Sequence, residues 1–243
     1  MFTLLKKEIS SFFSSLTGYI VIIVFLIVNS LFIWVFPGSN NVLDGGYASL
    51  DSLFIIAPWI FLFLVPAITM RMFPDEKKSG TIETLFTRPI TDLKIISAKS
   101  LAAFILVLFS IVPTLLYFYS VYKLGNPIGS IDTGGTWGSY IGLVFLSAIY
   151  VSIGIFSSSI TENQIVAFII GMFLCFVFFI GFDYLSELAL FGKIDSIVIN
   201  LGINEHYKSL SKGVIDSRDI IYFISVTIIF TLLTKIILQS RKW

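Results

Sequence analysis

The residues best suited to chemistry are few in this chain of 243 residues. There is one histidine, His206, and one cysteine, Cys175, and the acids do not cluster within the apolar stretches. Catalysis needs acid, base or nucleophilic groups placed together. A zinc or iron–sulfur site, or an internal disulfide, needs several cysteines. The sequence therefore predicts no catalytic residue and no metal site, and it predicts that His206 is a solvated loop residue.

The sequence also lacks a nucleotide-binding motif. A phosphate-binding loop reads Gly-x-x-x-x-Gly-Lys-Ser/Thr, and this pattern does not occur in the sequence. The net charge of +1 offers no basic field to a nucleic-acid backbone. We therefore expect no cofactor in this chain and no nucleic acid among its partners.

One polar segment, residues 71–97, has a spacing that indicates a function. Pro74 and Gly80 are expected to break the chain before a short helix, which has Ser79 as a candidate N-cap and Pro89 as its stop. Together with a lysine just beyond it, the segment contains six of the sixteen cations: Arg71, Lys77, Lys78, Arg88, Lys94 and Lys99.

The short predicted helix has one apolar stripe. Ile82, Leu85 and Phe86 follow the i, i+3, i+4 spacing, and Glu83 lies in the first turns, where an acid favours the helix dipole. Such a helix beside a membrane can dock in a groove of a cytoplasmic partner and receive force from it. The alternative, a helix that lies on the membrane surface and contacts nothing, fits the same periodicity.

The composition indicates that the polar segment is flanked by membrane-spanning helices. Only 13% of the residues are charged and 56% are apolar, with a mean hydropathy of +0.95, whereas a soluble domain has about 25% charged residues. We expect an all-α polytopic membrane protein with one domain, residues 1–243, because only short loops remain outside the spans. Stretches of about 20 apolar residues predict six spans at about 18–36, 52–70, 98–119, 137–159, 165–184 and 220–238.

Residues 1–17 predict an amphipathic helix in the membrane interface. A cytosolic extension of the first span is the alternative. The apolar run at 18–36 is longer than the about 7–15 residues of a signal-peptide core, so we expect a span rather than a cleaved leader. The apolar stripe of the interfacial helix consists of Phe2, Leu5, Ile9, Phe12 and Leu16.

The distribution of cations predicts the orientation. With the N-terminus inside, eleven of the sixteen lysines and arginines lie in inner segments and five lie in outer loops. Because cytoplasmic loops carry the excess of Lys and Arg, both termini are predicted to be cytoplasmic.

A few residues within the spans are candidates for a pathway or for helix packing. Asn29 is expected to bond to a neighbouring helix, and Asp183 to lie at the outer interface. Gly138 and Gly142 give the fourth span a face of small residues, which allows close helix approach. The segment 185–219 is too apolar for a free loop and predicts short helices at the outer interface.

The polar segment resembles the signature of ABC-2-type transporter permeases. The six spans, the leading interfacial helix and the apolar outer segment before the last span are also similar to that family. More narrowly, residues 206–219 resemble the permease subunit of the gliding-motility-associated ABC transporter of gliding bacteria. The signature residues are Glu76-x-x-x-Gly80-Thr81-Ile82-Glu83-x-Leu85-x-Thr87-x-Pro89-Ile90, followed by Lys99-x-Leu101-Ala102.

The resemblance implies partners and a place. It implies a separate ATPase chain that binds ATP and Mg, a second permease subunit, identical or related, and, for the gliding subgroup, a companion membrane protein with a large outer domain. It places the chain in the bacterial inner membrane, with export as the commoner direction of the family. It assigns the ATPase-contacting coupling helix to Glu76, Gly80, Thr81, Ile82, Glu83, Leu85, Phe86 and Pro89.

Two other functions remain open. An ABC-type membrane complex with a mechanical or regulatory role, and no transported solute, would have the same sequence features. An ion-driven secondary transporter is less well supported, because such proteins place charges near the middle of the membrane and the central spans here are almost free of charge.

Overall fold

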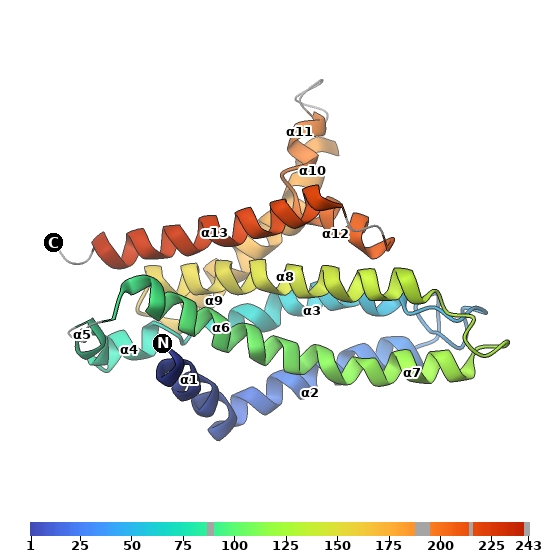
Figure 1. Ribbon diagram of the computed structural model, residues 1–243, viewed down its shortest axis with the longest axis horizontal. Coiled ribbons are helices and arrows are strands. Elements are labelled where there is room, and N and C mark those ends of the chain that lie inside the picture. Colours follow the sequence, from blue (N-terminus) through green and yellow to red (C-terminus); the bar gives the residue numbers. More distant parts are fainter. Residues whose placement is uncertain (87–89, 188–194, 214–215, 241–243) are drawn as a thin grey trace.

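The computed structural model describes residues 1–86, 90–187, 195–213 and 216–240, and within these ranges the chain is helical without strands. Six helical units are long and apolar enough to cross a membrane. They lie along the long axis of the molecule, with α1, α4 and α5 at one end and the loops 36–50 and 125–132 at the other (Figure 1). The predicted all-α polytopic fold with six spans is confirmed.

The helices that form these units have the following bounds. Two π-helical turns (η1 and η3) and one 3-10 turn (η2) directly follow α-helices in the chain. In chain order the elements are α1 Phe2–Ser14, α2 Leu16–Ser30, η1 Leu31–Val35, α3 Asp51–Thr69, α4 Pro74–Lys78, α5 Thr81–Phe86, α6 Asp92–Ile111, η2 Val112–Thr114, α7 Leu115–Leu124, α8 Thr133–Ile160, α9 Gln164–Phe176, η3 Val177–Gly181, α10 Phe182–Glu187, α11 Asp195–Ile199, α12 Ile203–Ser211 and α13 Ser217–Ser240.

The third span is longer than the sequence predicts. The expected range was 98–119, whereas the helical unit of α6, η2 and α7 runs from Asp92 to Leu124. Its first turns contain Lys94 and Lys99, so an apolar stretch marks only the middle of the helix. Pro113 tightens one turn without ending the helix.

The helix α8 is the centre of the bundle. It packs against α3, α6, α9, α12 and α13 and is the most buried of the six spans. Small residues allow this crowding. A Cβ added at Gly154 would lie 2.1 Å from Oγ1 of Thr69 in α3, so only glycine fits where α3 and α8 meet.

The helix α3 contains a buried proline that opens a backbone acceptor. Pro58 has no N–H, so the carbonyl oxygen of Phe54 lacks its partner within the helix. The hydroxyl of Tyr207 in α12 donates to that oxygen at 2.8 Å. Burial raises the pKa of Tyr207, which keeps this donor protonated. The proline of α3 and the tyrosine of α12 thereby join two elements distant in sequence.

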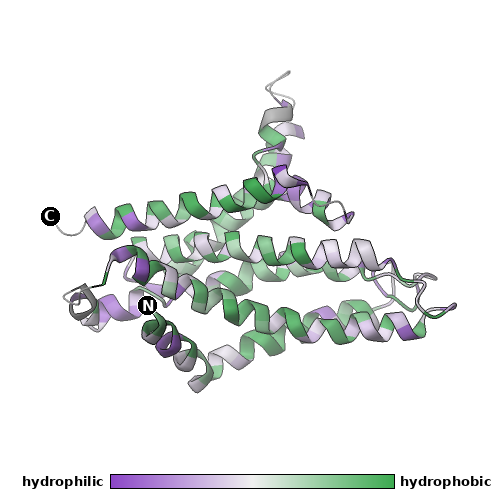
Figure 2. Ribbon diagram, in the orientation of Figure 1, coloured by the Kyte–Doolittle hydropathy of each residue, from purple (hydrophilic) through white to green (hydrophobic). Residues whose placement is uncertain are grey.

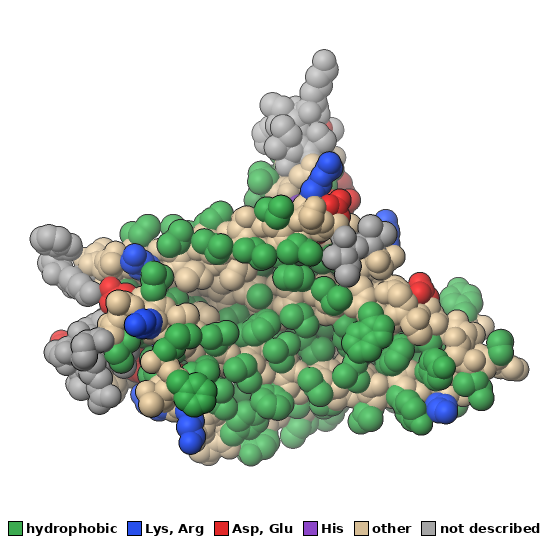
Figure 3. Space-filling model, in the orientation of Figure 1, with side chains coloured by type: hydrophobic (Ala, Val, Ile, Leu, Met, Phe, Trp, Pro, Cys, Tyr) green, Lys and Arg blue, Asp and Glu red, His purple; other side chains and the backbone are tan. Residues whose placement is uncertain are grey.

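The outer surface of the bundle is apolar along the spans. Figure 2 shows hydrophobic residues along the length of the helices and hydrophilic residues gathered at α1, α4 and near α12. In Figure 3 hydrophobic side chains cover the visible flank, and lysines, arginines and acids lie mainly towards its ends and beside α12. The units containing α2, α9 and α13 leave most of their residues uncovered by the rest of the chain, as expected of helices that face lipid or a second subunit.

The segment before the last span contains short helices, as the sequence predicts. Figure 1 shows α10 and α11 projecting away from the bundle near the N-terminal end of α13, with α12 beside them. The helix α12 packs against α8, α13 and η3. The residues 188–194 of this segment lie outside the described residues.

Candidate functional site

The polar segment between the second and third spans forms two short helices, not one. Pro74 begins α4 as its first residue, a position where a missing N–H costs nothing. The hydroxyl of Ser79 donates to the carbonyl oxygen of Asp75 at 2.8 Å and so belongs to the C-terminal end of α4. Gly80, with a φ of +68°, joins α4 to α5. The chain turns over 70–73, directly before Pro74, and again at Gly80, so breaks occur where the sequence predicts them, whereas the predicted N-cap role of Ser79 is wrong.

A buried lysine of α6 connects α4 to α1. The ammonium group of Lys99 lies 2.9 Å from Oε1 of Glu8 in α1 and 3.0 Å from Oε2 of Glu76 in α4. It also donates to the carbonyl oxygen of Met72 at 2.8 Å. Its exposed fraction is 1%. One side chain thus contacts the interfacial helix, the polar segment and the third span.

The charges of this cluster nearly balance. A buried ammonium group is stable only when it is paired and hydrogen-bonded, and Lys99 has two carboxylates and a carbonyl oxygen for this purpose. A second cation, Lys7, lies 3.5 Å from Oε1 of Glu76 on the exposed side. The ring of Phe73 lies 5.4 Å from the ammonium nitrogen and shields it from water.

The face that α1 turns to the bundle overlaps the predicted apolar stripe but also includes an acid. The buried residues of α1 are Leu4, Glu8 and Phe12. Of the predicted stripe, Phe12 is therefore buried, Leu5 and Ile9 are partly buried against the core, and Phe2 and Leu16 are exposed. The i, i+4 spacing of the buried residues places Glu8 between two apolar neighbours. The ion pair between Glu8 and Lys99 joins α1 to α6, and a hydrophobic pattern alone does not predict such a pair.

The helix α4 is also fastened to the turn between the fourth and fifth spans. The ammonium group of Lys77 donates to the carbonyl oxygens of Ser159 at 2.5 Å and Thr161 at 3.3 Å. Asp75 accepts a hydrogen bond from the amide of Gln164 at the start of α9. These carbonyl groups end α8 and have no partner within that helix, so the lysine satisfies them.

A second contact joins the start of the polar segment to α1. The guanidinium carbon of Arg71 lies 4.4 Å from the centre of the ring of Phe12, and Nη2 donates to the hydroxyl of Ser15 at 3.3 Å. The segment 71–78 therefore contacts α1, α6, α8 and α9 through named side chains. It is a junction of the bundle rather than a loop.

The helix α5 leaves polar side chains uncovered, as do Asp75 and Lys78 of α4. Thr81 and Glu83 are exposed, and Ile82 is half-buried and packs against the apolar core. The side chains of Leu85 and Phe86, and Pro89 as a whole, lie outside the described residues. Of the predicted stripe, the structure thus places Ile82 on the bundle side, and the proposed docking role of the stripe stays a prediction.

The predicted candidates within the spans are spread along the bundle. Asn29 is fully buried and its amide donates to the carbonyl oxygen of Phe25 in the same helix at 2.8 Å, so the expected bond to a neighbouring helix is not formed. Gly138 and Gly142 face α12: an added Cβ would lie 2.8 Å from the carbonyl oxygen of Leu210 and 3.2 Å from its Cβ, respectively. The structure does not bring these residues together at one site.

Asp183 in α10 and His206 in α12 each contact polar groups of neighbouring elements. Asp183 in α10 accepts a hydrogen bond from Asn204 and lies 3.7 Å from the ammonium group of Lys208. His206 is not a solvated loop residue: Nδ1 lies 2.7 Å from Oδ1 of Asp219, and Nε2 lies 2.9 Å from the carbonyl oxygen of Asn200. The prediction for His206 is wrong because its partners come from α13 and from the turn before α12.

The described residues contain no group of three or more potential metal ligands. Their charged groups form ion pairs between helices, and the largest cluster lies at the α4 end. Sequence reasoning named Glu76 and Lys99 within a motif, but it did not single out Glu8. One sequence signal could have indicated it: Glu8 lies four residues from each of two apolar residues, Leu4 and Phe12, in a helix whose other charged residues are lysines.

The sequence has also been compared with known proteins. A family model described as ABC-2 family transporter protein matches residues 3–190, which is more than half of the chain. The matched residues include α1, the polar segment with α4 and α5, and the first five spans. No curated protein matches the sequence significantly. The chain therefore belongs to the ABC-2 transporter family, whose members are non-catalytic membrane permeases, and it is a multi-pass membrane component of an ABC transporter.

Proposed function

We propose that the chain is the permease subunit of an ATP-driven exporter and that its ATPase, a separate chain, binds at α4 and α5. Family membership supports an ATPase partner in general terms. The observation that carries the location is that α4 is fastened to four helices while α5, directly after it, keeps Thr81 and Glu83 exposed.

The contacts of α4 suggest how force passes from an ATPase to the spans. A displacement of α5 acts on α4 across Gly80, which has the left-handed conformation that glycine favours. From α4 the displacement reaches α6 through Glu76 and Lys99, and it reaches the end of α8 through Lys77. Tightly packed elements of this kind move between discrete arrangements rather than bend continuously.

The remaining parts of the proposal follow the family resemblance. A second permease subunit, identical or related, pairs with this chain around the translocation route, and the two ATPase subunits supply all binding of ATP and Mg. The complex lies in the bacterial inner membrane with both termini in the cytoplasm. Its process is gliding motility, with a companion membrane protein that has a large outer domain.

The direct test is a charge reversal on α5. Glu83→Arg places a cation where the proposed interface expects an acid, so we expect at least a tenfold loss of co-purified ATPase from detergent-solubilised membranes. The loss of one interfacial charge pair and the repulsion that replaces it amount to more than about 1.4 kcal/mol, which corresponds to that factor.

A matched control distinguishes this effect from misfolding. Glu205 in α12 is likewise exposed, and it lies on an element at a distance from α4 and α5 (Figure 1), so Glu205→Arg should leave ATPase association unchanged. Membrane insertion of both variants is measured by extraction and by elution from a sizing column. Equal association of the ATPase with both variants would contradict the proposed interface.

A further inference from the structure

A cavity with a charged rim and an aromatic wall opens between α3, α8, η3 and α12. Its volume is about 630 Å³. The rim contains Asp51 at the start of α3 and Lys208 and Lys212 at the end of α12. The wall contains Phe54, Trp59 and Phe179, so the cavity changes from charged to apolar along the first half of α3.

The polar groups of the wall are already satisfied, whereas the cations of the rim have at most a distant, solvent-exposed partner. Tyr207 donates to the backbone of α3 as described above. Lys208 has a side chain that is 55% exposed and lies 3.7 Å from Asp183, longer than a direct hydrogen bond. Among the residues that the structure describes, Lys212 forms no ion pair. The lining of the cavity therefore contains two lysines and one acid, Asp51, and Asp183 lies near Lys208 from outside that lining.

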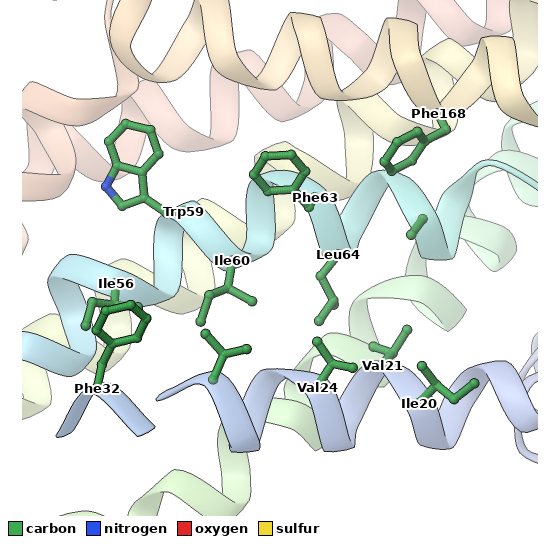
Figure 4. Close-up of a pocket in the computed structure, with 12 residues that line it drawn as sticks. Ile20, Val21, Val24, Phe32, Ile56, Trp59, Ile60, Phe63, Leu64 and Phe168 are labelled. Carbon is green, nitrogen blue, oxygen red and sulfur yellow. The ribbon is translucent and has the colours of Figure 1, made fainter. Parts of the chain in front are cut away.

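The apolar part of the cavity continues along α3. Trp59 also lines a second groove of about 630 Å³ between α2 and α3, which is lined by apolar side chains (Figure 4). Figure 4 shows Trp59, Phe63 and Phe168 on one side of α3, and Ile60 and Leu64 directed towards α2. From Asp51 to Ala67 the helix rises about 24 Å, at about 1.5 Å for each residue. One leaflet of hydrocarbon is about 15 Å deep, so this surface is long enough for an acyl chain.

We propose that the cavity binds an anionic phospholipid, with its phosphate at Lys208 and Lys212 and its acyl chains along α3 past Trp59. An apolar ligand without charge would leave Lys212 without a counter-charge and Lys208 with only the distant carboxylate of Asp183. A small soluble anion would leave the aromatic wall exposed to water. Only a molecule with an anionic head and an apolar tail matches both parts. This site is independent of the proposed contact with an ATPase.

The fluorescence of Trp59 reports occupancy directly. The full chain, with its other tryptophans replaced by phenylalanine, is reconstituted in nanodiscs of phosphatidylcholine without any ATPase. Phosphatidylglycerol or phosphatidylcholine with brominated acyl chains is then added at equal mole fraction, since bromine quenches a tryptophan that it contacts. We expect phosphatidylglycerol to quench Trp59 at a several-fold lower mole fraction than phosphatidylcholine.

Charge variants that should change the preference for phosphatidylglycerol in opposite directions identify the site. Lys208→Gln and Lys212→Gln should each weaken the preference for phosphatidylglycerol by about two- to fivefold, the range of a partly exposed ion pair. Asp51→Asn should strengthen that preference, because it removes the one carboxylate of the rim. Lys123→Gln, in an exposed cation of α7 outside the cavity, should leave it unchanged.

A second single-tryptophan protein controls for lipid contact in general. Trp137 in α8 is 52% exposed and does not line the cavity, so both lipids should quench it equally. Equal quenching of Trp59 by both lipids would overturn the proposal, as would a preference that survives both lysine variants. Quenching of Trp137 with none of Trp59 would mean that a protein surface covers the cavity, which also overturns it.

Discussion

At the scale of single residues, Lys99 is the most informative position in the chain. It is an ammonium group with 1% exposure at the start of a membrane span, and it is held by two carboxylates from different elements. The sequence predicts Lys99 only as a cytoplasmic cation within a family signature. Its burial depends on Glu8, 91 residues earlier, and no local pattern links two residues at that separation.

Removing Lys99 should be strongly destabilising. In Lys99→Met the carboxylates of Glu8 and Glu76 remain buried without their counter-charge, so we expect a loss of about 3–5 kcal/mol. The triple variant Lys99→Met, Glu8→Gln, Glu76→Gln removes all three charges and should recover most of that loss. Thermal unfolding in detergent measures both, with Lys123→Met at an exposed site as the control. A single variant as stable as the wild type would refute a structural role for the cluster.

At the scale of elements, the sequence predicts which segments are helices better than it predicts how they face each other. Six spans, a leading helix and short helices before the last span all occur, because apolar length and periodicity are local properties. The burial of Glu8 in α1 and the partners of His206 arise from contacts between distant residues. These features therefore required the structure.

The attachment of α4 to the end of α8 yields a prediction at this scale. Lys77→Met removes the donor to Ser159 and Thr161, and a hydrogen bond of a charged group contributes about 1.5–3 kcal/mol. We expect the amide hydrogens of α4 to exchange at least about tenfold faster. Lys78→Met is the matched control, since Lys78 is its exposed neighbour. Unchanged exchange in Lys77→Met would show that α4 is held without this contact.

At the scale of the whole molecule, the charges divide the bundle into two functional ends. At one end, ion pairs join α1, α4 and α6, and hydrogen bonds join α4 to α8 and α9, beside α5. The rim of the lipid cavity, with Lys208 and Lys212, lies at α12 on the other side of the apolar spans. Our proposals place an ATPase at the first end and an anionic lipid at the second, and family membership supports an ATPase partner in general terms.

Chemical capture of the ATPase by α5 tests the central claim most directly. Cys175 is fully buried, so an introduced cysteine is the only accessible thiol among the residues that the structure describes. Thr81→Cys and Tyr47→Cys place exposed thiols at opposite ends of the bundle, and a short thiol-reactive photo-crosslinker is attached to each in native membranes. We predict that Thr81→Cys captures a protein with a phosphate-binding loop and that Tyr47→Cys does not. Capture of that protein by Tyr47→Cys, or by neither variant in cells where the complex remains assembled, would contradict the proposed coupling site.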